Sequence, residues 1–232
     1  MGLIDGPVFR DHPDLSAANL VDSVGSRGEG LCLQNGSAAC HHGTFVVGIL
    51  AAKRDSSTPG ICPGCTLLVR PIFLEVTTKN REMPSATPDE LADAIIHCVD
   101  AGARVVNLSV AIAQPQSKSE RKLEESLDYA MRRGVLTVAA AGNQGTLGST
   151  SITRHPWVIP VIGCGQQGRP LNESNLGNPI GRRGLCAPGD GVRGLASDGK
   201  TVTSGGTSVS APFVTGTVAL LWSEFPSLLA SE

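Results

Sequence analysis

Apolar runs alternate with amphipathic segments along much of the chain, and this alternation predicts the secondary structure. Residues 66–72 form a β-branched and aliphatic run that is typical of a buried strand. Residues 87–90, Thr-Pro-Asp-Glu, form a helix-capping box with proline at the first helical position, and apolar residues then recur at helical spacing as far as Gly102. The pattern continues with a predicted strand over 103–110, a helix over 118–133 and a strand over 135–141.

Strands that are almost continuously apolar, separated by helices, indicate a mostly parallel β-sheet with helices on both faces. The sequence therefore predicts an α/β fold. After about residue 145, turn-forming glycines and prolines cluster around a short strand at 158–163, and a last helix follows the glycines at 205 and 206. No repeat or linker divides the chain, so we expect one domain over residues 1–232. We expect it to be trimmed at both ends, because the chain opens within a strand and stops just beyond a helix.

The composition describes a compact chain of small residues and excludes some classes of function. Hydrophobic residues make up 41% of the 232 residues, charged residues make up 17%, and the net charge is −2. Such a chain has no basic field for nucleic acid, and no apolar run approaches the roughly 20 residues that a membrane span needs. We expect a protein that binds neither nucleic acid nor membranes, and a monomer.

Seven cysteines lie at positions 32, 40, 62, 65, 98, 164 and 186, so at least one thiol is free. Cys62 and Cys65 enclose Pro-Gly, which predicts a turn into the following strand rather than the start of a redox-active helix. A zinc site would need a second pair of ligands, which Cys32 and Cys40 could supply; alternatively, those two could close a small loop as a disulfide. Cys98 lies on the apolar face of a helix, where it is expected to be a small buried hydrophobe.

Four short segments place a reactive group beside small residues. Asp5 ends an apolar strand, His42 stands at the start of an apolar helix, and Ser208 lies between a glycine turn and a helix start. Such strand ends are where α/β sheets bind ligands. If the three groups met there, the carboxylate could orient the imidazole, the imidazole could deprotonate the hydroxyl, and the hydroxyl oxygen could attack a substrate. Asn143, at the end of another strand, could donate its side-chain amide to a developing oxyanion.

Each of these residues also has a plain structural interpretation. Asp5 could form a turn, His42 could begin a helix, Asn143 could serve as a turn amide and Ser208 could be only an N-cap. The four segments, taken together with their flanking residues, favour the catalytic interpretation over the structural one. In order along the chain they read Ile4-Asp5-Gly6, His42-Gly43-Thr44, Ala140-Ala141-Gly142-Asn143 and Gly206-Thr207-Ser208-Val209-Ser210-Ala211-Pro212.

With these motifs in the order Asp, His, Ser, the sequence resembles the subtilisin-like serine proteases over essentially its whole length. The resemblance implies their three-layer α/β fold and hydrolysis of peptide bonds through an acyl-enzyme, with no cofactor required. It assigns Ser208 as the nucleophile, His42 as the general base and acid, and Asp5 as the group that orients the imidazole. Asn143 and the backbone N–H of Ser208 would form the oxyanion hole. His41 is set aside, because only His42 precedes Gly-Thr.

The resemblance also implies how a peptide or protein substrate lies. It would add as an extra strand, and its side chains would enter an S1 pocket, for the residue before the scissile bond (P1), and an apolar S4 pocket. The residues implied are Ser109, Val110 and Ala111 along the substrate strand, Ala140, Ala141 and Gly142 at the S1 wall, and Leu91 with Val110 at S4.

The sequence departs from the family at several of these places. Many members have Gly at the position of Ala111, and many have Ser or Thr at the position of Gly6. Gln144 follows Asn143 where an acid is common, which removes one attraction for a basic P1 residue. The family's structural calcium is possible but finds no support here, because the loop at 53–58 is basic at one end and short of oxygen ligands.

Residues 60–73 and the long polar loop after them resemble the subtilases that mature cyanobactin-type ribosomal peptides by removing a leader or follower. The members of that group that macrocyclise carry a helical cap between the Asp and His motifs. Only 36 residues separate Asp5 from His42, which favours hydrolysis.

Two further interpretations stay open beside the protease. One is an inactive member of the family that serves as a peptide-binding module, against which the complete set of four residues argues. The other is a lipase-like hydrolase, whose serine should precede the acid and the histidine in the chain rather than follow them. The chain shows no secretory signal; we expect a cytoplasmic location for a maturation enzyme and secretion for a degradative one.

Overall fold

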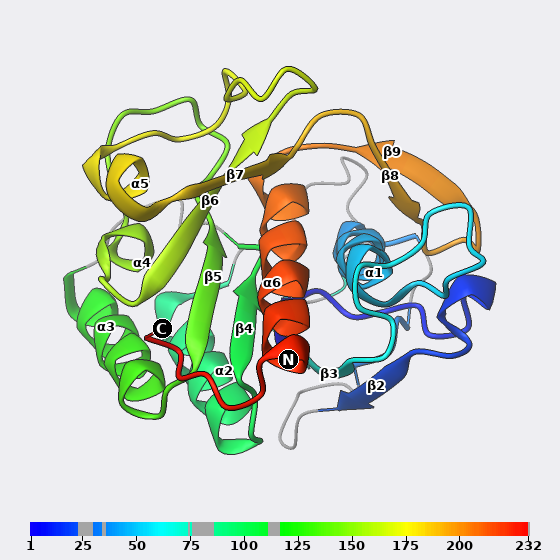
Figure 1. The fold of residues 1–232 in the computed structure, drawn as a ribbon, viewed down its shortest axis with the longest axis horizontal. Helices are drawn as coiled ribbons and strands as arrows, with labels where there is room; N and C mark the ends of the chain where they lie inside the picture. Colours follow the sequence, from blue (N-terminus) through cyan, green and yellow to red (C-terminus); the bar gives the residue numbers. More distant parts are fainter. Residues whose placement is uncertain (23–29, 34–35, 74, 76–85, 111–116, 232) are drawn as a thin grey trace.

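The structure is a computed structural model that describes residues 1–22, 30–33, 36–73, 75, 86–110 and 117–231. Its centre is a parallel seven-stranded sheet with the strand order β2-β3-β1-β4-β5-β6-β7 (Figure 1). The strands are β1 (Gly2–Asp5), β2 (Asn19–Asp22), β3 (Thr66–Pro71), β4 (Val105–Leu108), β5 (Leu136–Ala140), β6 (Val158–Cys164) and β7 (Leu185–Pro188). The expected α/β fold is confirmed.

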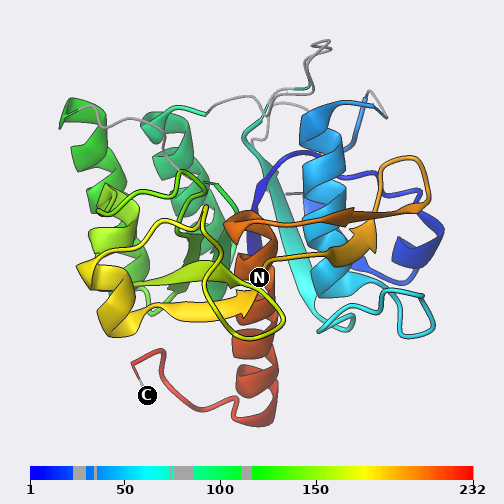
Figure 2. The ribbon, with the colours of Figure 1, turned by 90° about the horizontal axis from the view of Figure 1, so that it is seen from above.

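Helices cover both faces of this sheet. Figure 2 shows α2 and α3 on one side and α6 on the other. The helices are α1 (Ala38–Ala51), α2 (Pro88–Asp100), α3 (Ser117–Arg132), α4 (Ser151–Arg154), α5 (Asn178–Arg183) and α6 (Thr207–Glu224), with a 3₁₀ turn at Pro13–Leu15. A separate antiparallel hairpin joins β8 (Val192–Leu195) to β9 (Thr201–Ser204).

The strand residues alternate between two cores, as the period of two of a β-strand requires. In β1, Ile4 packs with the helices α2 and α3, whereas the preceding Leu3 packs with α1. In β4, Val106 belongs to the first core and Val105 packs with α6. Because both faces of β1 and β4 are buried, these strands read as continuous apolar runs in the sequence.

Two helix starts illustrate how local signals set the boundaries. At α2 the capping box is present: the Glu90 N–H donates to Thr87 Oγ1 (3.2 Å) and the Thr87 N–H donates to Glu90 Oε2 (2.8 Å). The expectation that His42 stands at a helix start is wrong. Helix α1 begins at Ala38, because Ser37 caps it by accepting the N–H of Cys40 (3.1 Å), and His42 therefore lies in its second turn.

The cysteines resolve into two disulfides and three free thiols. Disulfides join Cys32 to Cys40 and Cys164 to Cys186, so the first pair takes the disulfide alternative rather than the zinc alternative. Residues 62–65 form the predicted turn, with β3 beginning directly after it, and Cys98 is fully buried as expected. Among the described residues no helix is both long and apolar enough to cross a bilayer.

Candidate active site

The carboxyl end of β1 places Asp5 in the middle of the sheet, between β3 and β4. Its side chain is completely buried, and one oxygen, Oδ1, lies 2.6 Å from His42 Nδ1 and accepts the N–H of Gly6 (2.6 Å). The other oxygen, Oδ2, is buried and has no hydrogen-bond partner among the described residues. The residue after Asp5 is glycine, so no hydroxyl is present there to reach it.

Two glycines allow His42 to come this close. A Cβ on Gly6 would lie 2.0 Å from the carbonyl oxygen of Ala39, in the first turn of α1. A Cβ on Gly43 would lie 2.4 Å from the carbonyl oxygen of Pro7. The helix therefore packs directly on the chain that follows Asp5, and this contact brings the imidazole onto the carboxylate.

The hydrogen bond to Asp5 orients His42 so that it can act as a base. With Nδ1 donating to the Asp5 carboxylate, the neutral imidazole carries its lone pair on Nε2. Burial lowers the pKa of His42, but the charge of Asp5 and its hydrogen bond outweigh that effect, so the pKa is raised above the ordinary value of 6.5. The His42 side chain is still 20% exposed, so the imidazole can be reached from outside.

Ser208 is the second residue of α6, directly after a glycine turn in which Gly206 has a φ of +102°. Its backbone N–H is one of the helix-terminal donors that lack an intrahelical acceptor. A buried network fixes this end of the helix to the end of β4. Ser109 Oγ donates to the carbonyl of Ser208 (3.0 Å), Asn107 Nδ2 donates to Ser109 Oγ (2.7 Å), and Thr215 Oγ1 donates to Asn107 Oδ1 (2.8 Å).

Asn143 is joined to the same turn through Thr207. The backbone N–H of Thr207 donates to Asn143 Oδ1 (2.8 Å), and the N–H of Gly142 donates to Thr207 Oγ1 (3.1 Å). Because a backbone N–H requires an acceptor, the oxygen of the Asn143 amide must face Thr207, and its nitrogen keeps two hydrogens to donate. A Cβ on Gly206 would lie 3.0 Å from that nitrogen, so the amide donor sits against the turn before Ser208.

An apolar cluster brings the two halves of the site together. Phe45, one turn after His42 on α1, packs in one buried cluster with Val209, the neighbour of Ser208, and with Phe213 of α6. The face of α1 that carries His42 therefore meets the start of α6 that carries Ser208. The structure thus gathers all four residues singled out from the sequence at the carboxyl ends of the central strands.

The predicted substrate-binding residues lie around this point, although not all with free side chains. Val110 is 8% exposed, Ala140, Ala141 and Gly142 are buried, and the Ser109 hydroxyl is used in the network that anchors α6. Leu91, predicted to line an S4 pocket, is only 2% exposed, because it lies on the face of α2 that packs into the core. Ala111 lies outside the described residues.

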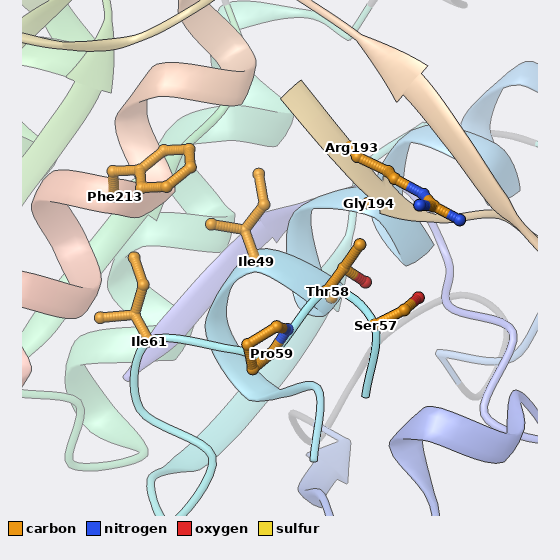
Figure 3. Close-up of a pocket in the computed structure, with 9 residues that line it drawn as sticks. Ile49, Ser57, Thr58, Pro59, Ile61, Arg193, Gly194 and Phe213 are labelled. Carbon is orange, nitrogen blue, oxygen red and sulfur yellow. The ribbon is translucent and has the colours of Figure 1, made fainter. Parts of the chain in front are cut away.

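Two cavities adjoin the site and a third lies apart from it. One of about 640 Å³ lies between the start of α1 and the β8–β9 hairpin and is bordered by His42. A second, of about 350 Å³, begins at Ala141 and Gln144. The third, of about 290 Å³, is formed by Ile49, Ile61, Phe213 and their neighbours and contains none of the four site residues (Figure 3).

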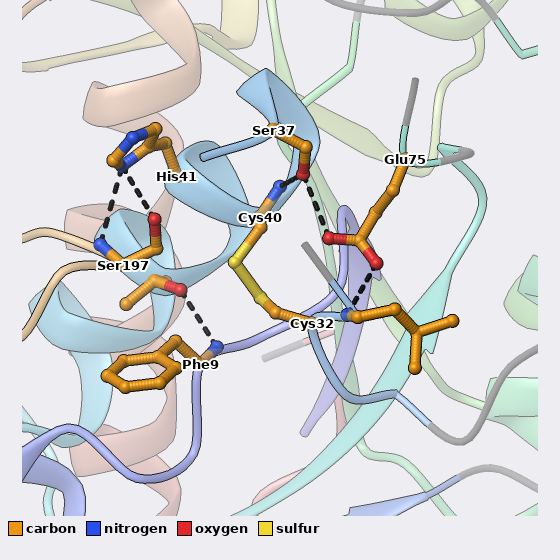
Figure 4. Close-up of a disulfide and its surroundings, with 9 residues drawn as sticks. Phe9, Cys32, Ser37, Cys40, His41, Glu75 and Ser197 are labelled. Atoms are coloured by element: carbon orange, nitrogen blue, oxygen red, sulfur yellow. Dashed lines mark hydrogen bonds between the residues drawn. A yellow bond between two sulfur atoms is a disulfide. The ribbon is translucent and has the colours of Figure 1, made fainter. Parts of the chain in front are cut away.

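A disulfide and a carboxylate hold the first turn of α1 just before His42 (Figure 4). Cys40 is tied to Cys32, and Glu75 accepts both the N–H of Leu33 (2.6 Å) and the hydroxyl of the helix cap Ser37 (2.9 Å). The sequence did not single out Glu75, because its partners lie about forty positions earlier in the chain. The bridging role of Thr207 had a signal, since Thr207 belongs to the serine motif.

The family comparison covers the complete chain. The model of the subtilase family matches residues 1–232. A thermophilic serine proteinase of Bacillus sp. (strain AK1) is 31% identical over 228 residues, which are 97% of this chain and 52% of that protein. Subtilisin DY of Bacillus licheniformis is 28% identical over 238 residues, which cover 100% of this chain and 79% of that protein. The chain spans about half the length of the first curated relatives it matches.

Solved structures with the same fold include proteases of peptide maturation. A serine-to-alanine mutant of the protease domain of PatA superposes with a TM-score of 0.87 at 31% identity, covering 96% of this chain and 78% of that one. The prenylagaramide maturation protease PagA superposes with a TM-score of 0.83 at 31% identity, covering 96% of this chain and 74% of that one.

Proposed function

The chain belongs to the subtilase family, and from that premise we propose that it is a serine endopeptidase. The observation that carries the proposal is the buried Asp5–His42 pair at 2.6 Å, placed by packing of α1 against the α6 turn that presents Ser208. An inactive binding module would have no need to keep a buried carboxylate paired with an imidazole. Burying a carboxylate costs free energy unless it is fully hydrogen-bonded, and Oδ2 of Asp5 is not bonded within the described chain, so a function is needed to explain why this cost is kept.

Each residue then has a step to perform. His42 Nε2 accepts the proton of Ser208 Oγ as that oxygen attacks the substrate carbonyl, and the ion pair with Asp5 stabilises the imidazolium that results. The developing oxyanion accepts hydrogen bonds from Asn143 Nδ2 and from the N–H of Ser208. His42 then returns the proton to the leaving amine, and a water molecule, deprotonated in the same way, hydrolyses the acyl-enzyme.

A fluorophosphonate probe tests this proposal directly. The probe should attach covalently to the Ser208 hydroxyl, because it reacts with an activated serine and not with ordinary surface hydroxyls. Mass spectrometry of the tryptic peptide locates the adduct, and His42→Ala should reduce labelling sharply while the protein stays folded. Folded wild-type protein that takes no label would instead favour the peptide-binding module.

Asn143→Ala should lower kcat by about 10²–10³, because the change removes one of the two donors to the oxyanion. KM should change little, since the oxyanion forms only in the transition state. Steady-state kinetics with one peptide substrate measures both constants. Asn19→Ala is the matched control, since its amide donates to Thr66 Oγ1 at the sheet edge (2.7 Å), away from the site. A higher KM at unchanged kcat would place Asn143 in ground-state binding and contradict the assignment.

A role in maturing a ribosomal peptide is the second candidate, and the superpositions on PatA and PagA favour it. A maturation enzyme differs from a degradative one in its products: it cuts a leader-bearing precursor at one position and leaves an unfolded carrier protein largely intact. Among the described residues between Asp5 and His42 only a 3₁₀ turn, β2 and the start of α1 occur, so hydrolysis stays our prediction over macrocyclisation.

We propose that the loop at 53–58 is held without calcium. The ammonium of Lys53 lies 3.4 Å from Asp14 and 3.9 Å from Asp55, and Ser56 donates to the second oxygen of Asp14 (2.7 Å). The Ser56 hydrogen bond and the nearby Lys53 lower the pKa of Asp14 although burial opposes them. The carboxylates of Asp14 and Asp55 are therefore engaged with a protein cation, and they do not supply the six to eight oxygens typical of calcium.

A further inference from the structure

We propose that this protein cleaves after residues with a long, positively charged side chain, and that Glu120 selects them. The inference rests on the proposed protease function and concerns the cavity of about 350 Å³ beside Asn143. Its lining includes Glu120, Ala141, Gln144, Ser151, Arg154 and Asn175.

The position of the cavity decides which substrate residue enters it. Ala141 and Gln144 lie on either side of Gly142 and Asn143, the residues whose amides meet the α6 turn. A scissile carbonyl that accepts a hydrogen bond from Asn143 belongs to the residue before the cleaved bond. The side chain of that residue therefore starts beside the oxyanion donors and extends into this cavity.

The charges around the cavity do not cancel. Arg154 lies 3.7 Å from Glu124, so its charge is balanced by a residue of α3. Glu120, in the first turn of α3, is partly buried, and neither an ion pair nor a hydrogen bond to it occurs in the described part of the chain. Within the described residues the cavity thus carries one unbalanced negative charge, which attracts a substrate cation and repels an acidic side chain.

The wall of the cavity suits a long side chain with a cationic end. A lysine ammonium or an arginine guanidinium supplies several donors at the end of an aliphatic stem, and that stem can lie along the apolar wall formed by Ala141.

The motif around Asn143 lacks one attraction for a basic P1 residue, because Gln144 replaces an acid that is common in the family. The structure supplies a carboxylate from a different element, about 24 positions earlier in the chain. A large apolar side chain would take water away from Glu120 without pairing its charge, so it is a poorer fit.

Peptides that differ only at P1 test the proposal. We expect kcat/KM for Lys or Arg to exceed that for Gln, Leu or Glu by about 10-fold or more, as one charge-assisted contact provides. Glu120→Gln should remove most of that preference by lowering kcat/KM for the Lys and Arg peptides toward the value for the Gln peptide. Glu120→Lys should turn the preference toward Glu.

Glu125→Gln is the matched control, because Glu125 lies on the same helix, is 61% exposed and pairs with Arg121 rather than lining the cavity. This variant should keep the wild-type P1 profile. Fluorophosphonate labelling of every variant distinguishes a failure of the P1 proposal from a failure of the proposed protease function. Labelled protein without a basic preference, or with one that Glu120→Gln leaves intact, overturns the P1 proposal alone; protein that neither labels nor cleaves any peptide overturns the proposed function and this inference with it.

Discussion

Ser208→Ala is expected to lower kcat for peptide hydrolysis by about six orders of magnitude, as loss of the nucleophile does in a subtilisin. The methyl group cannot attack the carbonyl, so the acyl-enzyme path closes. What remains is the stabilisation by Asn143 and the helix N–H groups, which act on a water attack only weakly. Hydrolysis of a fluorogenic peptide under conditions of enzyme excess measures the residual rate.

The variant should fold as the wild type does. The hydrogen bond that fixes the start of α6 goes to the backbone carbonyl of Ser208, and alanine keeps that carbonyl. Ser223→Ala, on the same helix and away from its first turn, is the control for the loss of a hydroxyl and should retain full activity. If Ser208→Ala kept about a thousandth of the activity or more, another group would have to be the nucleophile.

Much of the architecture could be predicted from the sequence because its determinants are local. The capping box at Thr87 and Glu90 and the turn at 62–65 involve residues only three positions apart, and both occur as expected. Helix α1 begins four residues earlier than the predicted start at His42. Its first turn is held by Ser37, a disulfide and Glu75, and only the first of these is visible nearby in the sequence.

In the candidate site, too, the local features could be predicted from the sequence and the long-range contacts could not. The motifs pointed to the four residues, because each carries its chemistry in a recognisable string. They could not show how the residues are supported, since Asn107 reaches Thr215 across 108 positions and Ser109 reaches Ser208 across 99. The departure at Gly6 is explained only in space: the carbonyl of Ala39 occupies the place of a side chain, and the second oxygen of Asp5 has no partner within the described chain.

Asp5→Asn is expected to lower kcat by about 10⁴, because an amide favours the wrong tautomer of His42. In the wild type the carboxylate accepts the Nδ1 proton and leaves Nε2 free to act as a base. An asparagine that turns its NH₂ toward Nδ1 makes that nitrogen an acceptor, and the proton moves to Nε2, where it blocks the attack by Ser208. Asp128→Asn is the matched control, since Asp128 pairs with His155 at 3.2 Å outside the site.

The pH profile of kcat/KM separates this explanation from a general loss of structure. The base must be neutral, so wild-type activity should fall as the pH decreases through a His42 pKa that Asp5 raises above 6.5. Burial alone lowers that pKa, so removing the charge of Asp5 should move the acidic limb of the residual activity to lower pH. Asp128→Asn should leave the limb where it is. A limb that stays in place in Asp5→Asn would mean that Asp5 does not set the ionisation of His42, and the fall in kcat would then report damage to the packing of α1 on Gly6.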